Sequence, residues 1–298
     1  MEFGTIVSCM ELLAHLDNPD WVVLDCRHMP FDFQAGYSAY SLSHIPGARF
    51  AHTAHDLSGA SGSGKGRHPL PDPKDFVQTL QHWGIDNNKQ IVAYDDSGSI
   101  YAARLWWMLR WVGHYRVAVL DGGWGKWGQE IGLVTSQASS VPASKTTHFW
   151  LNLHNAAQVN VDFMERNLES DYLRIIDARP PRRFIGVYEQ QDPVGGHIPG
   201  AINRFFKKNL DANQCFLSPT TLRMAFTPLI GATPLHRVIH QCGAGITACN
   251  NILAMEIAGL QGSKLYPGSW SEWCSNPRRP MAAALLAPVS NLRSPQNL

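Results

Sequence analysis

The sequence predicts an α/β fold of two tandem domains, each a mainly parallel sheet flanked by helices on both faces. Two observations carry this prediction. Four sequence blocks of the first half recur in the same order in the second half, and short β-branched runs alternate with helical stretches in both halves. Such alternation is typical of βα units, whose strands pair in parallel. The 298 residues are enough for two domains of ordinary size.

The expected strands are the β-branched runs of each half. They span residues 22–25, 90–94 and 117–120 in the first half, and 174–177 and 237–241 in the second. Helices are expected to begin at Ser8, where Glu11 gives the spacing of a capping box, and at Ser218-Pro219. Ligand sites of parallel sheets form at the carboxyl ends of strands. The residue that follows the 237–241 run is Cys242.

The repeated blocks pair one to one across the two halves. VVLDCRH (22–28) matches RIIDARP (174–180), SHIPGARF (43–50) matches GHIPGAINRF (196–205), the block from 90 matches that from 237, and DGGWGKW (121–127) matches YPGSWSEW (266–273). Four blocks in one order indicate an internal duplication. Residues that occur once per half, such as His44 and His197, are therefore expected to be architectural. The repeated tryptophans and the Asp-x-Arg pairs are expected to be structural as well.

Cys242 is the first candidate for chemistry. It stands before a glycine-rich turn and an apparently helical stretch, in HQCGAGITACNNILAMEIAGL (240–260). A thiol among unpaired amides at a helix N-terminus is stabilised as a thiolate. Gly243 and Gly245 permit the chain to curl round the sulfur. The amides able to hydrogen-bond a sulfur anion are then those of Gly243, Ala244, Gly245, Ile246 and Thr247.

The assignments of Cys242 and Thr247 each have an alternative. Cys242 could be a small buried apolar residue, and the Thr247 hydroxyl could either add a donor to the site or cap the following helix.

In the first half the matching stretch is YDDSGS. Counting from the tryptophan aligns Cys242 with Asp96, and counting along the strand aligns it with Asp95. Either residue is an acid, so we expect one active site, lined by both domains.

Composition excludes several classes of partner. The net charge is +1 with no long run of Lys or Arg, which gives no footprint for nucleic acid or an anionic membrane. The N-terminal stretch does not read as a secretory signal, and no segment is long enough to span a bilayer. Six scattered cysteines without a CxxC pair favour reduced thiols in the cytoplasm and make a zinc site unexpected.

The motifs DARPPRRF, GHIPGAIN, CGAGITAC and GSWSEW resemble those of the tandem-domain sulfurtransferases, the rhodanese and 3-mercaptopyruvate sulfurtransferase family. The loop of that family commonly reads CGSGVTA in the mercaptopyruvate branch and CRKGVTA in animal rhodanese. The resemblance covers about residues 5 to 282. It implies a catalytically inactive rhodanese-like domain over 1–137, a linker over 138–156, a catalytic rhodanese-like domain over 157–283 and a peripheral tail over 284–298.

The resemblance also implies a reaction. The Cys242 thiolate takes sulfur from thiosulfate or 3-mercaptopyruvate, holds it as a persulfide, and yields it to cyanide, a dithiol or thioredoxin, without a metal or organic cofactor. One alternative is a sulfur-carrier or binding module that turns over no small donor. Another is a cysteine phosphatase, which needs an arginine six positions after the cysteine to clamp phosphate. That position is Ala248.

By resemblance, Arg183 grips the anionic donor and His68 relays protons from the first domain. A loop histidine facing water is the alternative for His68. The sequence also departs from the mercaptopyruvate branch. The loop serine is replaced by Ala244, the relay acid falls near Ala54, and YEQQDPVGG stands where a second arginine is usual. Arg67 could equally serve thiosulfate.

Overall fold

The computed structural model describes residues 2–32, 34–62, 64–139, 147–170 and 173–283. The first domain contains one five-stranded parallel sheet in the order β1-β5-β4-β2-β3. Its strands are β1 (Ile6–Val7), β2 (Trp21–Asp25), β3 (Arg49–Phe50), β4 (Gln90–Tyr94) and β5 (Val117–Leu120). Its helices are α1 (Cys9–Ala14), α2 (Ala35–Leu42), α3 (Pro73–His82), α4 (Ile100–Trp111) and α5 (Gly123–Glu130).

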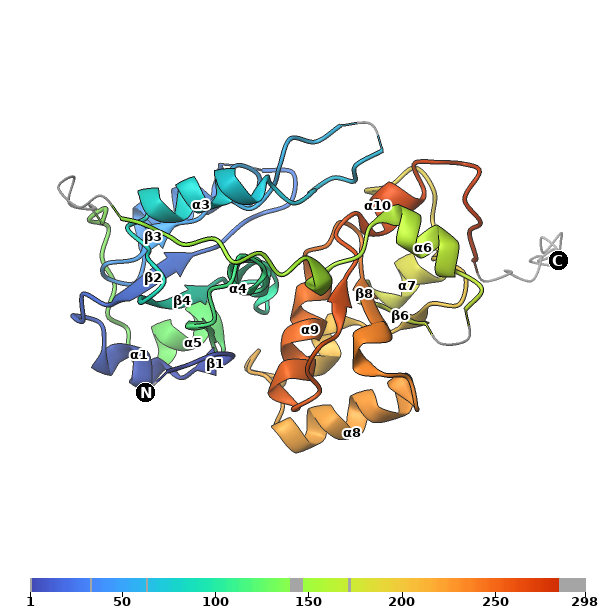
Figure 1. Ribbon diagram of the computed structural model, residues 1–298. Helices are drawn as coiled ribbons and strands as arrows, with labels where there is room; N and C mark the ends of the chain where they lie inside the picture. Colours follow the sequence, from blue (N-terminus) through green and yellow to red (C-terminus); the bar gives the residue numbers. More distant parts are fainter. Residues whose placement is uncertain (1, 33, 63, 140–146, 171–172, 284–298) are drawn as a thin grey trace, which may run out of the picture.

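The second domain repeats this topology with a four-stranded parallel sheet in the order β7-β6-β8-β9. Its strands are β6 (Arg174–Asp177), β7 (Ile202–Asn203), β8 (Val238–Gln241) and β9 (Lys264–Leu265). Its helices are α6 (Val161–Asn167), α7 (Pro181–Phe184), α8 (Pro219–Ile230), α9 (Thr247–Ile257) and α10 (Ser269–Trp273), and short 3-10 turns cover Asn155–Ala157, Phe206–Asn209 and Leu235–Arg237. A parallel bridge between Gln158 and Leu265 takes the place of β1. Figure 1 shows the two domains side by side.

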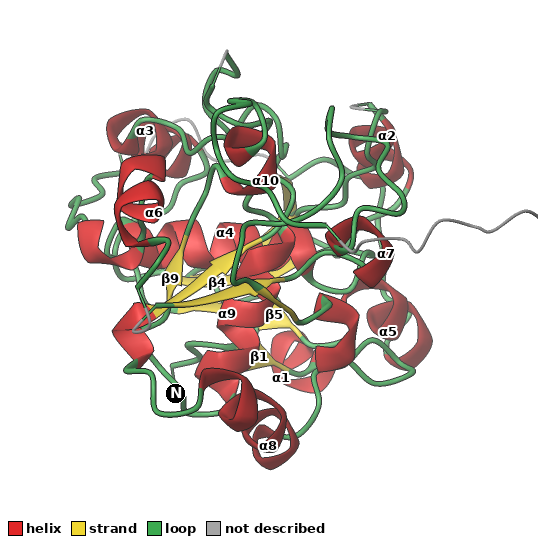
Figure 2. Cartoon of the chain, turned by 90° about the vertical axis from the view of Figure 1, so that its right-hand side faces the viewer, coloured by secondary structure: helices red, strands yellow, loops and turns green. Residues whose placement is uncertain are grey.

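Helices cover both faces of each sheet, as predicted (Figure 2). In the first domain, Val22 and Leu24 of β2 join the core under α3 and α4, whereas Val23 joins the core under α1 and α5. In the second domain, α8 and α9 cover one face, and α6 and α10 cover the other. Both faces of the strands are apolar because both are buried.

The equivalent helices α4 and α9 pack against each other between the two sheets. Most residues of both helices are buried, and one apolar cluster runs through them from the first domain into the second. A helix that is apolar on all sides is buried on all sides. The two domains therefore share a core.

The expected helix starts and strands are confirmed within one residue. Ser8 and Glu11 form the capping box at α1, and the Ser218 hydroxyl accepts a hydrogen bond from the Thr221 amide at α8. The described part of the expected linker runs along the first domain. There the Trp150 amide donates a hydrogen bond to Asn87 Oδ1. Residues 140–146 of that linker and the expected tail at 284–298 lie outside the described residues.

The repeated Asp-x-Arg pairs are structural. Arg27 donates to Asp25 and to the Ser43 carbonyl, and Arg179 donates in the same way to Asp177 and to the Gly196 carbonyl. All four charged side chains are buried. Each pair thus ties the end of a central strand to the repeated HIPG block.

The repeated histidines and tryptophans have packing roles. His44 is fully buried, with Nδ1 2.7 Å from the Tyr40 carbonyl oxygen, and His197 Nδ1 lies 2.8 Å from the Phe184 carbonyl oxygen. Trp127, Trp270 and Trp273 are fully buried. Within the described residues, no helix is both long enough and apolar enough to cross a membrane.

Candidate active site

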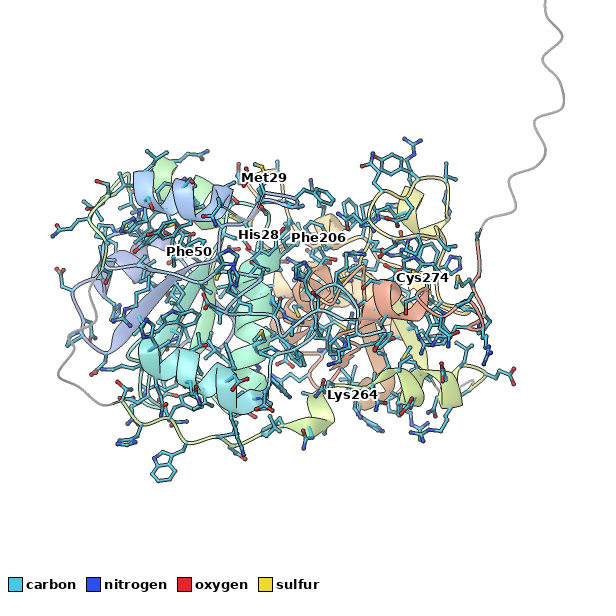
Figure 3. All side chains as sticks on the ribbon, turned by 90° about the horizontal axis from the view of Figure 1, so that it is seen from above. His28, Met29, Phe50, Phe206, Lys264 and Cys274 are labelled. Carbon is cyan, nitrogen blue, oxygen red and sulfur yellow. The ribbon has the colours of Figure 1, made fainter. Side chains whose placement is uncertain are left out.

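A cavity of about 510 Å³ lies between the domains, at the carboxyl ends of β6 and β8. His28 of the first domain and Phe206 of the second both line it, and Figure 3 labels both near the junction of the two domains. The predicted site residues that line it are Arg183, His68, Cys242, Gly243, Ala244, Ile246 and Thr247. Gly245 is not among the lining residues. The structure therefore brings all of the predicted site residues except Gly245 to the wall of one cavity built by both domains.

The loop that carries Cys242 is held by the start of α10. The Cys242 amide donates to Ser269 Oγ at 3.1 Å, and the Cys242 carbonyl accepts from the Trp270 amide at 3.0 Å. The Gly243 carbonyl accepts from the Ser271 amide at 2.9 Å. The Cys242 side chain is buried against this frame, with 2% of the residue exposed. Sequence reasoning missed Ser269, although it follows Gly268 in the repeated block at 266–273.

The two loop glycines serve different purposes. Gly245 has φ +75°, and a Cβ there would lie 2.4 Å from the Pro267 carbonyl oxygen, so this position requires glycine. Gly243 has no positive φ, and a Cβ on it would lie 2.9 Å from Arg67 Nη2. The expectation that both glycines permit the curl is correct for Gly245 and wrong for Gly243. Gly243 instead leaves room for a guanidinium group.

Thr247 is the first residue of α9, and Ile246 is the N-cap residue, without a side-chain cap. Thr247 is therefore not the N-cap residue. Cys249, in the first turn of α9, is fully buried, and burial raises the pKa of its thiol to about 12. The expectation that Cys249 belongs to the core is confirmed.

The first domain carries the same loop with a carboxylate in place of the thiol. Tyr94 pairs with Asp25 as Gln241 pairs with Asp177, so Asp95 corresponds to Cys242. The left-handed glycines agree as well, because Gly98 has φ +77°. Of the two alignments left open by the sequence, that with Asp95 is correct and that with Asp96 is wrong.

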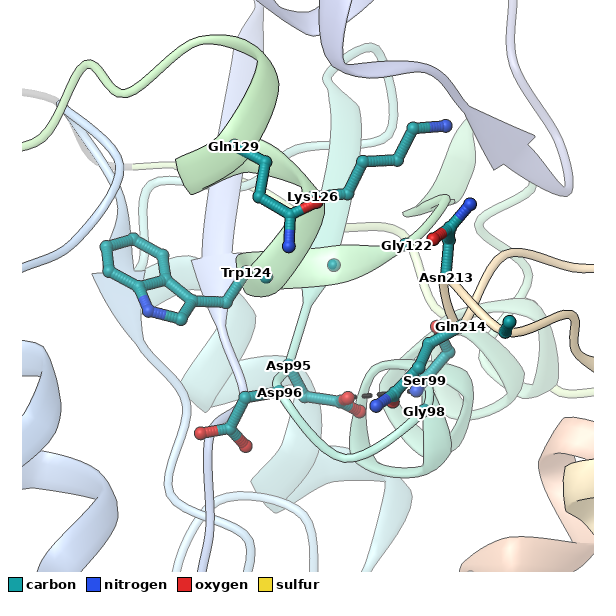
Figure 4. Close-up of a pocket in the computed structure, with 13 residues that line it drawn as sticks. Asp95, Asp96, Gly98, Ser99, Gly122, Trp124, Lys126, Gln129, Asn213 and Gln214 are labelled. Carbon is teal, nitrogen blue, oxygen red and sulfur yellow. Dashed lines mark hydrogen bonds between the residues drawn. The ribbon is translucent and has the colours of Figure 1, made fainter.

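The Asp95 carboxylate lies in a cradle of backbone amides, of which Figure 4 shows that of Ser99. Its Oδ1 accepts from the amides of Ser97 and Ser99 at 2.8 and 2.9 Å, and its Oδ2 accepts from those of Tyr101 and Ala102 at 2.8 and 2.9 Å. This loop thus converges amide donors on an anion. By the same correspondence, we expect the amides of Ala244, Ile246 and Ala248 to converge on the Cys242 side chain.

Arg104 of α4 is a buried cation directly behind the Cys242 loop. It is 1% exposed, and its Nη1 donates to the Gly245 carbonyl at 3.1 Å. Its Nη2 lies 3.3 Å from the carbonyl oxygens of Leu57 and His68. Among the described residues, no carboxylate forms an ion pair with it. A buried positive charge without a paired carboxylate is complementary to an anion bound at the loop. Sequence reasoning missed Arg104, because it lies within an apolar helix of the inactive copy.

His68 faces the cavity and is only partly exposed, which contradicts the alternative of a loop histidine in water. Burial, then the charges of Arg104 and Arg67, lower its pKa to about 4. The Ser58 hydroxyl donates to the Thr53 carbonyl at 2.8 Å, and His68 Nδ1 lies 3.2 Å from Ser58 Oγ. Because the single hydroxyl hydrogen is already used, Nδ1 carries the imidazole proton and Nε2 is the free base.

Arg183 lies beside the Cys242 loop and is held by a carboxylate. Its Nε and Nη2 donate to the two oxygens of Glu189 at 3.0 and 2.7 Å. Backbone amides, above all that of Gln191, also donate to Glu189. Although burial opposes it, hydrogen bonding to Arg183 and to these amides lowers the pKa of Glu189. Arg183 is therefore a fixed cation at the cavity wall.

The model of the rhodanese-like domain matches residues 8–130 and 160–276, which together make up most of the chain. The chain belongs to the rhodanese family. The two matched ranges fall within the expected domains at 1–137 and 157–283. The cradle around Asp95 and the loop at Cys242 are thus the same element in two copies of one rhodanese-like domain.

Rhodanese-family relatives match over nearly the whole chain. A probable 3-mercaptopyruvate sulfurtransferase of Pseudomonas aeruginosa is 39% identical over 284 residues, covering 95% of this chain and 99% of the relative. The thiosulfate sulfurtransferase of Bos taurus is 34% identical, covering 86% of this chain and 85% of the relative. The 3-mercaptopyruvate sulfurtransferase of Leishmania major superposes with a TM-score of 0.77 at 27% identity, over 91% of this chain and 74% of that one. This chain is a sulfurtransferase of the same family.

Proposed function

We propose that this sulfurtransferase uses thiosulfate or 3-mercaptopyruvate as its sulfur donor and carries the sulfur as a persulfide on Cys242. The observation that carries the proposal is a thiol at the cavity wall, on a loop equivalent to the amide cradle of Asp95 and contacted by the buried cation of Arg104. Amide donors and a cation stabilise both the attacking thiolate and the persulfide anion that replaces it. Arg183 and His68 supply a charge and a base beside the sulfur.

With thiosulfate, the Cys242 thiolate attacks the outer sulfur, a sulfur–sulfur bond forms, and the donor's own sulfur–sulfur bond breaks to release sulfite. With 3-mercaptopyruvate, the thiolate attacks the donor sulfur and the carbon–sulfur bond breaks. The thiol proton of the donor ends on that carbon, which gives pyruvate. In both cases the negative charge of the thiolate moves to the terminal sulfur of the persulfide. Cyanide or a thiol then removes that sulfur and restores the thiolate.

The proposal includes a thiol acceptor such as thioredoxin, and a reducing compartment such as the cytoplasm. All six cysteines are free thiols, which is compatible with such a compartment. A phosphatase is less compatible with the loop, because position 248 is alanine and offers no guanidinium for phosphate. A carrier module differs from the proposed enzyme only in that its persulfide would not discharge to an acceptor.

The experiment is sulfur transfer by the Cys242→Ser protein. We expect the variant to keep the wild-type circular dichroism spectrum and thermal midpoint, and to form no thiocyanate from cyanide with either donor. The wild type should gain one sulfur atom in its intact mass after incubation with a donor and lose it when cyanide is added. Cys215→Ser, which removes a cysteine that does not line the cavity, should behave as the wild type. Transfer at the wild-type rate by Cys242→Ser would refute the proposal.

A further inference from the structure

Two carboxylates with nearly buried side chains lie behind the arginines of the cavity wall. Glu189 and Asp192 belong to one loop of the second domain, and their side chains are 6% and 2% exposed. Glu189 accepts from Arg183, as described above. Asp192 accepts from Arg67 Nη1 and, at 3.2 Å, from Arg183 Nη2. Neither carboxylate lines the cavity itself, so each acts on its contents from behind a guanidinium group.

The same arginines adjoin the residue after the thiol. Arg67 Nη2 lies 2.9 Å, and Arg183 Nη1 lies 3.7 Å, from the position of a Cβ on Gly243. Asp192 accepts from the other terminal nitrogen of each guanidinium group. The width of one guanidinium group therefore separates this carboxylate from the space beside the sulfur. A charge in that space interacts with Asp192 over a short path that water screens weakly.

The loop that carries the two carboxylates is fixed in place. Gln191 Oε1 accepts from Arg67 Nη2 at 3.1 Å and from Arg183 Nη1 at 3.0 Å. Glu189 Oε1 accepts from the amides of the three residues that follow it, at 2.9, 2.8 and 3.2 Å. These contacts join the loop to both domains. The negative charges are thus held at the wall rather than turned into solvent.

The charges around the donor space cancel. Three arginines line the cavity, and each forms an ion pair with a carboxylate: Arg67 with Asp192, Arg179 with Asp177, and Arg183 with Glu189. The remaining cation is Arg104, and the Cys242 thiolate that attacks the donor offsets it. His68 adds no charge at neutral pH, because its pKa is about 4. A donor anion therefore enters a site whose positive charges are already matched.

The cost of entering such a site depends on the charge of the donor. The energy needed to take an ion out of water rises with the square of its charge. Its repulsion by a fixed carboxylate rises in proportion to its charge. At neutral pH thiosulfate carries two negative charges, whereas 3-mercaptopyruvate carries one, because its thiol is protonated. Thiosulfate is therefore opposed more strongly than 3-mercaptopyruvate.

We propose that Asp192, assisted by Glu189, makes this enzyme select singly charged sulfur donors, so that 3-mercaptopyruvate is preferred to thiosulfate. The inference rests on the proposed function, since the donor must reach Cys242. Specific sites use repulsive groups against the wrong partner as well as attractive groups for the right one. Asp192 is such a repulsive group. It touches no donor and sets specificity through its charge.

The experiment compares two donors that share their chemistry and differ in charge. Thiosulfate and the methanethiosulfonate ion both yield the outer sulfur to a thiolate as the sulfur–sulfur bond breaks, releasing sulfite and methanesulfinate respectively. The first donor carries two charges and the second carries one. The quantity measured is the ratio of kcat/KM for thiosulfate to kcat/KM for methanethiosulfonate. We expect Asp192→Asn, which keeps an acceptor oxygen and loses the charge, to raise this ratio by about ten- to fiftyfold.

Two further variants separate charge from structure. Gln191→Glu adds a negative charge beside Asp192 and should lower the ratio, opposite to Asp192→Asn. Glu169→Gln, at an exposed carboxylate in the turn after α6, removes the same charge and should leave the ratio unchanged. Damage to the loop would instead reduce transfer from both donors in both loop variants. In the wild type, kcat/KM should be higher for 3-mercaptopyruvate than for thiosulfate, and Asp192→Asn should narrow that difference.

Opposite shifts of the ratio support the inference. If both loop variants leave the ratio unchanged, or shift it in the same direction, the carboxylates only position the arginines and the inference is wrong. Should Asp192→Asn fail to fold, Gln191→Glu decides alone, and an unchanged or raised ratio overturns the inference. The proposed function would still stand in each case, because it fails only if Cys242→Ser transfers sulfur.

Discussion

The residues at the ends of β4 and β8 show how one loop can serve two purposes. Asp95 satisfies four amides with its own carboxylate. The equivalent Cys242 has a single sulfur atom, so under the proposed function we expect the amides of its loop to be available to a second sulfur. With a carboxylate the amide donors of the loop are already used, whereas with a thiol they are expected to remain available. This difference explains at the level of one side chain why only the second copy can carry a persulfide.

His68 is a base rather than an acid at neutral pH. Because burial and two arginines lower its pKa to about 4, its imidazole is neutral there, with Nε2 free to accept a proton. Transfer from 3-mercaptopyruvate requires a proton to move from sulfur to carbon, whereas transfer from thiosulfate moves none. We therefore expect His68→Gln to lower kcat/KM for 3-mercaptopyruvate by about a hundredfold, the typical contribution of a general base, and to change thiosulfate transfer little.

The pH profile provides the check. With His68 acting as a base whose pKa is about 4, protonation of this residue should reduce 3-mercaptopyruvate transfer only when the pH falls toward that value. His55→Gln, at an exposed histidine of the preceding loop, should match the wild type with both donors. An equal loss with both donors, or an acid limb near the ordinary histidine pKa that disappears in His68→Gln, would contradict this role.

At the scale of elements, the turn between β8 and α9 depends on its two glycines in different ways. Gly245→Ala forces a left-handed backbone and a clash with the Pro267 carbonyl, so we expect it to destabilise the protein by about 1–3 kcal/mol or more. In Gly243→Ala the new methyl group meets the ends of the flexible Arg67 and Arg183 side chains. It should leave stability nearly unchanged and raise KM for the donors. Urea unfolding and steady-state kinetics measure the two effects separately.

The reverse pattern would overturn this interpretation of the turn. A stable Gly245→Ala protein with raised KM, or a strongly destabilised Gly243→Ala protein, would mean that the left-handed position has been assigned to the wrong glycine. Gly98→Ala serves as the matched variant in the first copy. It has the same left-handed backbone, so it should lower stability while leaving donor KM unchanged.

The sequence predicted those elements that local chemistry determines. The capping residues at Ser8 and Ser218, the β-branched strands and the Cys242 loop could be located from composition and spacing alone. Contacts between distant segments could not. Arg104 was missed because its role depends on the packing of α4 against α9. The meeting of Arg67 with Gln191 and Asp192 depends on how the two domains dock, which no local pattern encodes.

At the scale of the whole molecule, the active site exists only because the domains share a core. Arg67, His68 and Arg104 come from the inactive copy, and Cys242 and Arg183 come from the other. The apolar cluster through α4 and α9 holds these contributions in register. We therefore infer that the inactive copy persists as half of the site, and that the two domains unfold together.

The buried histidines make this common core sensitive to acid. Burial lowers the pKa of His240, on β8, from 6.5 to about 3. As the pH falls below 6.5, the unfolded chain takes up a proton that the folded protein binds only near pH 3. Unfolding therefore becomes more favourable through this window, and the stability present above it is lost. Asp95 acts in the opposite direction, because burial raises its pKa to about 6.

We expect His240→Phe to weaken this acid sensitivity in both domains at once. The free energy of unfolding of the wild type falls as the pH drops from about 6 to about 5. Because the variant lacks the proton uptake at position 240, its free energy of unfolding should fall by about 1.4 kcal/mol per pH unit less than that of the wild type. Other titrating groups cancel in the comparison. Pulse alkylation of Cys26 and Cys249, both fully buried, reports the first and second domain during urea unfolding. The two cysteines should become reactive in one transition that moves with pH. Separate transitions, with only Cys249 responding to the substitution, would mean that the shared core does not couple the domains.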